Sequence, residues 1–265
     1  MLTKIHMPTS EARVSDLFED DGFEFAVSMD CEGTNYDKNL DANVLNLERF
    51  VSKASEHGIR VVLFVTPIFA DALRRHGLAE RLPRDYRVIY GLHIHPDNLP
   101  GSIAKDCPFL RPGEEYLASY TREEQRSIIA PAADYLEECG VFPLQAFRGG
   151  CFSMNDDTAA VVLEETSIRA ESHNPFREQY SVTSGGLRSL PVYALSRDEE
   201  FRLEFFTTEK LRSMLSDAIA KDSKVMAITH SYMLDPDDFH YGRDGIVDDI
   251  HTRLARLIDT MEAAR

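Results

Sequence analysis

Two closely spaced pairs of polar residues are the first groups in this chain that could do chemistry. Asp30 and Glu32 follow one apolar stretch, and His93 and His95 end another. Residues at i and i+2 of an extended segment project to the same side. One carboxylate could therefore bind a metal while the other accepts a proton, and both imidazoles could reach the same ion. Each pair also has a plainer interpretation, either an acidic loop or histidines that satisfy hydrogen bonds in the core.

Two further residues suit the same chemistry. Arg148 precedes two glycines, and its guanidinium could hold a carboxylate ionised through a two-pronged hydrogen bond. His230 emerges from an apolar segment, and an imidazole can protonate a departing amine or alkoxide near neutral pH. The residues leave open whether Arg148 binds substrate or forms an ordinary ion pair, and whether His230 is a buried structural histidine.

Alternating strand and helix patterns place these residues where strands end. Apolar segments predict strands at 23–29, 61–65, 86–95, 145–148 and 224–229, with an edge element at 189–192. Helical spacing predicts helices at 40–57, 70–78, 121–139, 156–166, 207–220 and 248–264, and Thr121-Arg-Glu-Glu resembles a capping box that opens the third of them. The stretch 97–119 is expected to be a long surface excursion. Strands that alternate with helices pair in parallel, and active sites lie at their C-terminal ends. The pattern predicts an α/β fold, a distorted or incomplete (β/α) barrel.

Composition limits the classes of partner. The chain has 265 residues, of which 43% are apolar and 28% charged, and no repeat or linker divides it, so a single domain over 1–265 is expected. The net charge of −16 argues against a nucleic-acid partner, because phosphate binding needs clustered Lys and Arg. No stretch approaches the roughly 20 apolar residues of a membrane helix, so we expect no membrane insertion.

Targeting and redox signals favour the cytoplasm. The segment 1–10 lacks the apolar run of a signal peptide. The four cysteines are widely spaced without a CxxC pair, which indicates reduced thiols. We therefore expect a cytoplasmic protein, and the sequence leaves its oligomeric state open.

The order of the motifs resembles the polysaccharide-deacetylase superfamily (carbohydrate esterase family four), the group around the nodulation-factor and chitin deacetylases. The resemblance extends over about residues 23–235 and is carried by the segments 28–33, 58–65, 93–96, 147–150 and 229–231. Two motifs differ from the family pattern: Asp-Cys-Glu replaces Asp-Asp, and His-x-His replaces His-x-x-x-His. Both variants are similar to a divergent branch often linked to surface-polysaccharide biosynthesis.

The resemblance implies a barrel of about seven parallel strands and a set of site residues. The catalytic residues would be Asp30 as general base, Arg148 orienting it, and His230 as general acid, while the metal ligands would be Glu32, His93 and His95. The cofactor would be one divalent metal ion, with zinc the default for mixed nitrogen and oxygen ligands and iron, cobalt, nickel and manganese left open. Glu32 lies one residue beyond the family's metal-binding Asp, which leaves open whether Asp30 or Glu32 binds the metal.

The implied function is that of a metal-dependent hydrolase that removes an acyl group, N-acetyl by expectation, from a sugar or glycan precursor. Alternatives are a carbon–nitrogen hydrolase acting on a small non-sugar amide, and a catalytically inactive metal- or glycan-binding relative. Phe152, Tyr232 and His240 follow motif strands and are the candidate substrate-binding residues, whereas His173 is expected in a surface loop.

Overall fold

A parallel sheet of seven strands forms the centre of the computed structural model, which describes residues 12–33, 36–183, 186–235 and 249–264. The strand order is β8-β6-β4-β3-β2-β1-β9, and every neighbouring pair is parallel. The strands are β1 (Glu24–Cys31), β2 (Arg60–Val65), β3 (Val88–Ile94), β4 (Leu144–Gly149), β6 (Ala170–Glu171), β8 (Arg188–Ser189) and β9 (Lys224–His230). The sheet curls into a half-barrel, and the predicted fold class is confirmed.

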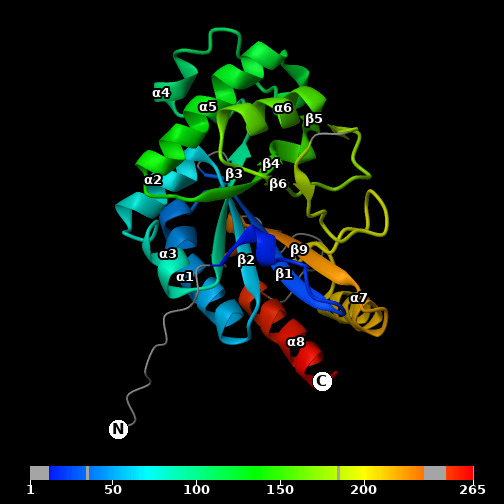
Figure 1. Cartoon of the computed structure of the whole chain (residues 1–265). Helices are drawn as coiled ribbons and strands as arrows, with labels where there is room; N and C mark the ends of the chain where they lie inside the picture. The colour runs from blue at the N-terminus through cyan, green and yellow to red at the C-terminus, as the bar shows by residue number, and fades with distance from the viewer. Residues whose placement is uncertain (1–11, 34–35, 184–185, 236–248, 265) are drawn as a thin grey trace.

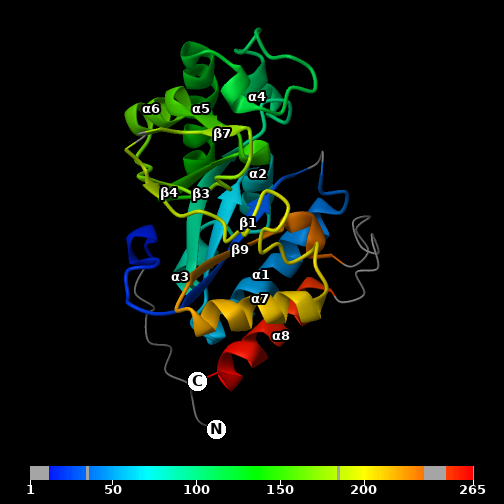
Figure 2. The same ribbon diagram turned by 90° about the vertical axis from the view of Figure 1, so that its right-hand side faces the viewer.

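Helices cover the convex side of this sheet. They are α1 (Leu40–Glu56), α2 (Pro67–Arg75), α3 (Arg81–Asp85), α4 (Gly101–Ala104), α5 (Arg122–Glu138), α6 (Asp156–Glu165), α7 (Thr208–Ala220) and α8 (Ile250–Ala263). The pair α5 and α6 lies at one end of the molecule and the pair α7 and α8 at the other (Figure 1). In the view turned by 90°, α5 lies beside α6 and α7 lies beside α8 (Figure 2). None of the described helices is both long and apolar enough to cross a membrane.

Strand alternation divides most of the core into two apolar clusters, and a third, small one holds Phe152, Val192 and Ile228. On β1, Val27 and Met29 pack with the helices, whereas Ala26 faces the inside of the half-barrel. The inner cluster also holds Phe64 and Ile89, and it is capped by the N-terminal segment through Leu17. Side chains alternate along a strand. On β1, β3, β4 and β9, the inner face is therefore apolar near the N-terminal end of the strand and polar near its C-terminal end. The polar end is where the candidate residues lie.

An irregular segment, residues 190–203, joins the two edges of the half-barrel. At one edge, Leu190 N–H donates to the Glu171 carbonyl at 2.8 Å and Val192 N–H to the His173 carbonyl at 3.1 Å. At the other edge, Leu203 N–H donates to the carbonyl of Ile228 in β9 at 2.9 Å. We call residues 190–203 the closing segment, because it follows β8 and bridges the gap between the two edge strands, β8 and β9.

The predicted helices agree with the structure except at their ends and in the shortest elements. The capping box of Thr121 and Glu124 opens α5 as expected. Helix α2 begins three residues earlier than predicted, since Pro67 suits the first helical position and Thr66 accepts a hydrogen bond from Phe69 N–H. The expected excursion 97–119 contains the short helix α4 and a 3-10 turn, η2 (Leu117–Ser119).

Four further short elements lie close to the site or to the N-terminus. They are a two-stranded sheet of β5 (Met154–Asn155) and β7 (Tyr180–Ser181), and the 3-10 turns η1 (Val14–Asp16), η3 (Gly150–Phe152) and η4 (Ser231–Met233). The turns η3 and η4 directly follow β4 and β9, so they set the direction in which the chain leaves the site.

Candidate active site

Glu32, His93 and His95 form a buried cluster where β1 and β3 end. Glu32 Oε1 lies 3.5 Å from His93 Nε2, and Glu32 Oε2 lies 3.2 Å from His95 Nε2. The three side chains offer one ligand atom each within 4.8 Å of one another. They reach this point because β1 and β3 are separated only by β2 and their inner-face residues point the same way.

The hydrogen bond of His93 shows which of its ring nitrogens is available to bind a ligand. His93 Nδ1 lies 2.8 Å from the carbonyl oxygen of Arg148. A carbonyl can only accept, so Nδ1 carries the proton, and the lone pair of a neutral His93 Nε2 faces Glu32. Glu32 Oε2, His93 Nε2 and both ring nitrogens of His95 are buried without a hydrogen-bond partner. A proton on one imidazole or a metal ion between these atoms would satisfy them, and two imidazoles with one carboxylate are a ligand set that zinc accepts.

The backbone of Glu32 is held on both sides. Its carbonyl oxygen accepts from Thr66 Oγ1 at 2.6 Å, and its N–H donates to Ser231 Oγ at 3.1 Å. Gly33 then turns the chain away from the strand at φ 101°, a conformation that glycine adopts without strain. Burial raises the pKa of Glu32, but the adjacent imidazoles of His95 and His93 hold it well below its ordinary value.

Asp30 and Arg148 form the second part of the site. Arg148 Nη1 lies 2.6 Å from Asp30 Oδ1, and its Nη2 donates to the hydroxyls of Ser28 and Ser172 at 2.9 and 2.7 Å. Arg148 is fully buried, with its guanidinium 4.1 Å above the ring of Phe64. Burial raises the pKa of Asp30, but Arg148 and the neighbouring imidazoles outweigh this, so that pKa lies below its ordinary value. Asp30 is therefore an ionised, rigidly held carboxylate.

His230 lies beside Asp30 and has a partner of its own. Its Nε2 is 3.9 Å from Asp30 Oδ2, and its Nδ1 is 2.6 Å from Glu204 Oε1. The ring of Tyr232 stacks on the imidazole at 4.8 Å between centroids. Burial raises the pKa of Glu204, but His230 and Arg202 outweigh it, so the carboxylate stays ionised. Glu204 thus fixes the orientation of His230 and directs its Nε2 toward Asp30.

A cavity of about 430 Å³ opens onto both parts of the site. Among its lining residues are Asp30, Glu32, His95 and His230, together with Tyr36, Phe152 and Tyr232. Phe152 and Tyr232, which were predicted to bind substrate, line this cavity, and their contact with a substrate stays a prediction. His240, the third such residue, lies outside the described residues.

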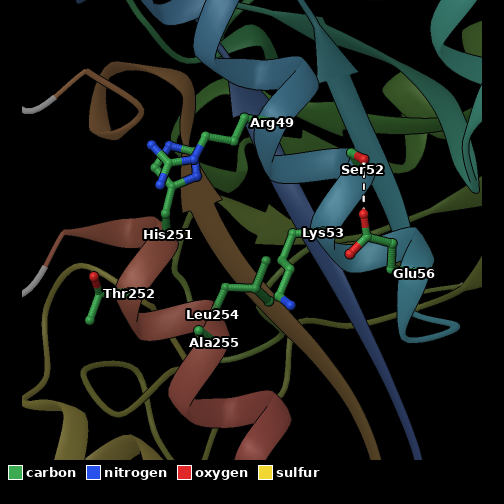
Figure 3. Close-up of a pocket in the computed structure, with 8 residues that line it drawn as sticks. All are labelled: Arg49, Ser52, Lys53, Glu56, His251, Thr252, Leu254 and Ala255. Carbon is green, nitrogen blue, oxygen red and sulfur yellow. Dashed lines mark hydrogen bonds between the residues drawn. The ribbon is translucent and has the colours of Figure 1, made fainter.

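A second cavity, of about 380 Å³, lies between α1 and α8 (Figure 3). Its wall carries Arg49, Lys53 and His251, and Ser52 donates to Glu56 across its edge at 3.5 Å. Burial and the charge of Arg49 lower the pKa of His251. This wall contains none of the side chains predicted to do chemistry, so the cavity at the sheet end is the candidate active site.

The expectation for His173 was wrong. This residue is 1% exposed, and its ring nitrogens bridge two elements rather than facing solvent. Nδ1 lies 2.9 Å from Glu171 Oε2, and Nε2 accepts from Gly149 N–H at 2.8 Å. The two-residue strand β6 gave too little apolar pattern to place it. His173 therefore supports the end of β4 at Gly149, the residue that follows Arg148.

Sequence reasoning also missed Glu204, which no motif marks. A weak signal existed, because Arg202 and Glu204 alternate with the apolar Phe201 and Leu203, as in a half-buried extended segment. Such a segment directs both polar side chains to one side, and the structure places that side at the candidate active site.

Comparison with known proteins gives the fold. No family model and no curated protein sequence matches this chain. A Mycobacterium smegmatis structure provisionally assigned as a polysaccharide deacetylase matches with a TM-score of 0.50 and 15% identity, over 97% of this chain and 89% of that one. A family 4 carbohydrate esterase from Streptomyces lividans, in complex with acetate, matches with a TM-score of 0.49 and 11% identity, over 91% and 88%.

A third similar structure is the 4-alpha-glucanotransferase from Thermococcus litoralis, with a TM-score of 0.51 and 10% identity over 90% of this chain and 37% of that one. At these identities the likeness concerns the fold. The chain has the fold of the polysaccharide deacetylases, in a divergent form, as its motifs indicated. The same fold accommodates different chemistries, so the function has to be argued from the site.

Proposed function

We propose that this chain is a metal-dependent hydrolase that removes an acyl group, N-acetyl in the first instance, from a sugar or glycan precursor. The observation that carries the proposal is the cluster of Glu32, His93 and His95, whose buried lone pairs face one another beside Asp30 and His230. A cation site next to a carboxylate and an imidazole is the arrangement needed for hydrolysis of an amide or ester.

Glu32, His93 and His95 would hold one divalent ion, with zinc preferred for this mixed set. The ion would polarise the acyl carbonyl and make a bound water more acidic. Asp30 belongs to the Arg148 network, so we assign Glu32 as the metal-binding carboxylate. This assignment addresses the choice between the two carboxylates that the motif left open.

Proton transfer would use the remaining two side chains. Asp30, kept ionised by Arg148, would accept a proton from the attacking water. His230 would donate a proton from Nε2 to the departing nitrogen, with Glu204 stabilising the imidazolium through Nδ1. The acyl carbon–nitrogen bond then breaks, and the products are an amine and a carboxylate. The separation of 3.9 Å between Asp30 and His230 allows both to reach one tetrahedral centre.

A second candidate activity is hydrolysis of a small non-sugar amide. The cavity of about 430 Å³ is of the size that takes one small molecule, which suits such a substrate as well as a monosaccharide unit.

The proposal also includes the location of the protein: we propose that it acts on a soluble precursor in the cytoplasm. Cell fractionation with an antibody against the chain would test that location.

The test begins with metal content. Elemental analysis of the purified chain should find about one transition-metal ion, and Glu32→Ala and the double variant His93→Ala/His95→Ala should lose it. The loaded chain is then assayed for acetate release from N-acetylated sugars and for ring opening of cyclic amides. Metal binding with neither activity would favour the inactive binding relative, and a native chain that cannot be loaded with metal would overturn the proposal.

A further inference from the structure

The wall of the candidate active site carries more positive charge than the rest of the chain would suggest. The chain has a net charge of −16, yet Arg177, Arg197 and Arg202 line the cavity, against the two carboxylates of Asp30 and Glu32. The two carboxylates already have roles beside Arg148 and in the cation site. The three arginines belong to neither of these groups and need their own explanation.

Arg202 is a buried cation with donor groups to spare. It is 9% exposed and lies in the closing segment. Its Nη2 donates to Glu200 Oε1 at 3.3 Å, its Nη1 is 3.8 Å from Glu204 Oε1, and its Nε is buried without a partner. Burial lowers the pKa of Arg202, but Glu204 and Glu200 outweigh this and keep the guanidinium charged.

Arg177 reaches the same carboxylate from a different segment. Its Nη2 lies 2.5 Å from Glu200 Oε1, and its Nε is also buried without a partner. Each guanidinium has five N–H donors, and the carboxylates that they contact, Glu200 for both and Glu204 for Arg202, leave the Nε of each side chain without an acceptor. Buried donors without acceptors cost free energy, and both side chains line the cavity. An acceptor brought in by the ligand would satisfy them.

We infer that the substrate carries an anionic group, a carboxylate or a phosphate, which Arg177 and Arg202 bind inside the cavity while the exposed Arg197 contributes at its rim. Guanidinium forks match both anions through paired hydrogen bonds. This inference rests on the proposed function in naming an acylated saccharide as the carrier of the charge. It narrows the substrate to an acidic or phosphorylated N-acylated sugar.

A structural role for the same arginines makes a different prediction. If Arg177 and Arg202 only clamp the closing segment through Glu200, neutral and anionic sugars will bind equally well. Arg202 also contacts Glu204, so replacing it would disturb His230 as well. Arg177, which pairs with Glu200 alone among the described charged groups, is the cleaner position to change.

The experiment is a calorimetric titration of the zinc-loaded full chain with three probes: a neutral N-acetylhexosamine, its phosphate ester and its uronic acid. At least one anionic probe should bind about 10-fold or more tightly than the neutral one, and Arg177→Gln should remove most of that difference. Arg212→Gln, on the exposed face of α7, should leave it unchanged. Arg197→Gln, at the exposed rim, gives a second variant if Arg177→Gln does not fold.

The two anionic probes separate carboxylate from phosphate recognition. An anion bound only to the metal would retain its affinity in Arg177→Gln, and that result would overturn the inference, as would equal binding of all three probes. Acetate release without a preference for anions would support the proposed hydrolase activity and contradict the inferred anion site. Anion binding that depends on Arg177, without acetate release from any probe, would support the anion site and contradict the proposed hydrolase activity.

Discussion

The carbonyl oxygen of Arg148 accepts a hydrogen bond from His93 Nδ1 at 2.8 Å, while the side chain of Arg148 holds Asp30 at 2.6 Å. One residue of β4 therefore supports a candidate metal ligand with its backbone and the candidate base with its guanidinium. The two functions can be separated by mutation, because a substitution changes the side chain and leaves the carbonyl in place.

Arg148→Lys should abolish most turnover and spare the metal. A lysine keeps the positive charge but cannot bond Asp30, Ser28 and Ser172 in one plane. We expect acetate release to fall about 100-fold or more and the free energy of unfolding to fall by about 3 kcal/mol, as for disruption of a buried ion pair. Elemental analysis, acetate assays and urea denaturation measure these effects. A loss of metal in this variant would contradict the prediction that the side chain of Arg148 is not needed for metal binding.

Gly150→Ala should weaken metal binding although it replaces none of the candidate metal ligands. A Cβ at Gly150 would lie 2.4 Å from His95 Nδ1, so the ring of His95 must move. We expect zinc affinity to fall by about 10-fold or more, the size of effect seen when groups that orient ligands are changed. A competition titration with a zinc chelator measures it. Gly101→Ala is the matched control, because a Cβ there meets nothing within 4 Å, and equal affinity in the two variants would refute the prediction.

Glu204→Gln should lower kcat and leave KM and metal content unchanged. The amide can still accept from His230 Nδ1, but it no longer stabilises an imidazolium with a full charge. We expect kcat to fall on the order of 10³-fold, by analogy with the loss of the orienting carboxylate in hydrolase triads. Steady-state kinetics of acetate release test it, with Glu199→Gln at an exposed site of the closing segment as control. A rise in KM alone would show that Glu204 acts in substrate binding instead.

Glu171→Gln should reduce the sensitivity of the fold to acid. Burial raises the pKa of Glu171, but His173 outweighs it and the pKa lies below its ordinary value of 4.5. A carboxylate with a depressed folded pKa stabilises the fold above about 4.5, and that stabilisation is lost as the pH falls through the folded pKa. The amide oxygen of the glutamine variant could still accept the hydrogen bond from His173 Nδ1, but the amide would not titrate.

Urea denaturation between pH 7 and pH 3 measures this effect. The native chain should lose stability more steeply below pH 4.5 than Glu171→Gln, and the variant should be about 2 kcal/mol less stable at pH 7 because it lacks a charge-assisted hydrogen bond. Glu137→Gln, on the exposed face of α5, should follow the native curve. Parallel curves for the native chain and Glu171→Gln would show that this carboxylate does not contribute to acid unfolding.

Strand periodicity made the central part of the site predictable. Asp30 and Glu32, and likewise His93 and His95, are spaced by two residues, so an extended backbone directs each pair to one face. Parallel pairing then brings the ends of β1 and β3 together. The sequence also indicated the capping box of α5 and most of the longer elements, because their apolar spacing is regular.

The second wall of the cavity was not predictable for a physical reason. Glu204, Arg177 and Arg202 lie in irregular segments, whose course is set by hydrogen bonds to distant residues rather than by local spacing. Leu203, for example, is placed by its hydrogen bond to Ile228 in β9. His173 was misplaced for the same reason, since the strand before it has only two residues.

The closing segment has a consequence for how such a protein can diversify. The groups proposed for bond cleavage lie at the ends of β1, β3, β4 and β9 or one residue beyond them, with Glu204 held just beyond the closing segment. Arg197 and Arg202 lie on a segment that closes the gap between the edges of the sheet through only a few hydrogen bonds. Mutations at positions of this segment that do not contact Glu204, such as Arg197, can therefore alter which molecule is accepted while the reaction itself is retained. A protein of this fold can thus acquire new substrates through changes within residues 190–203.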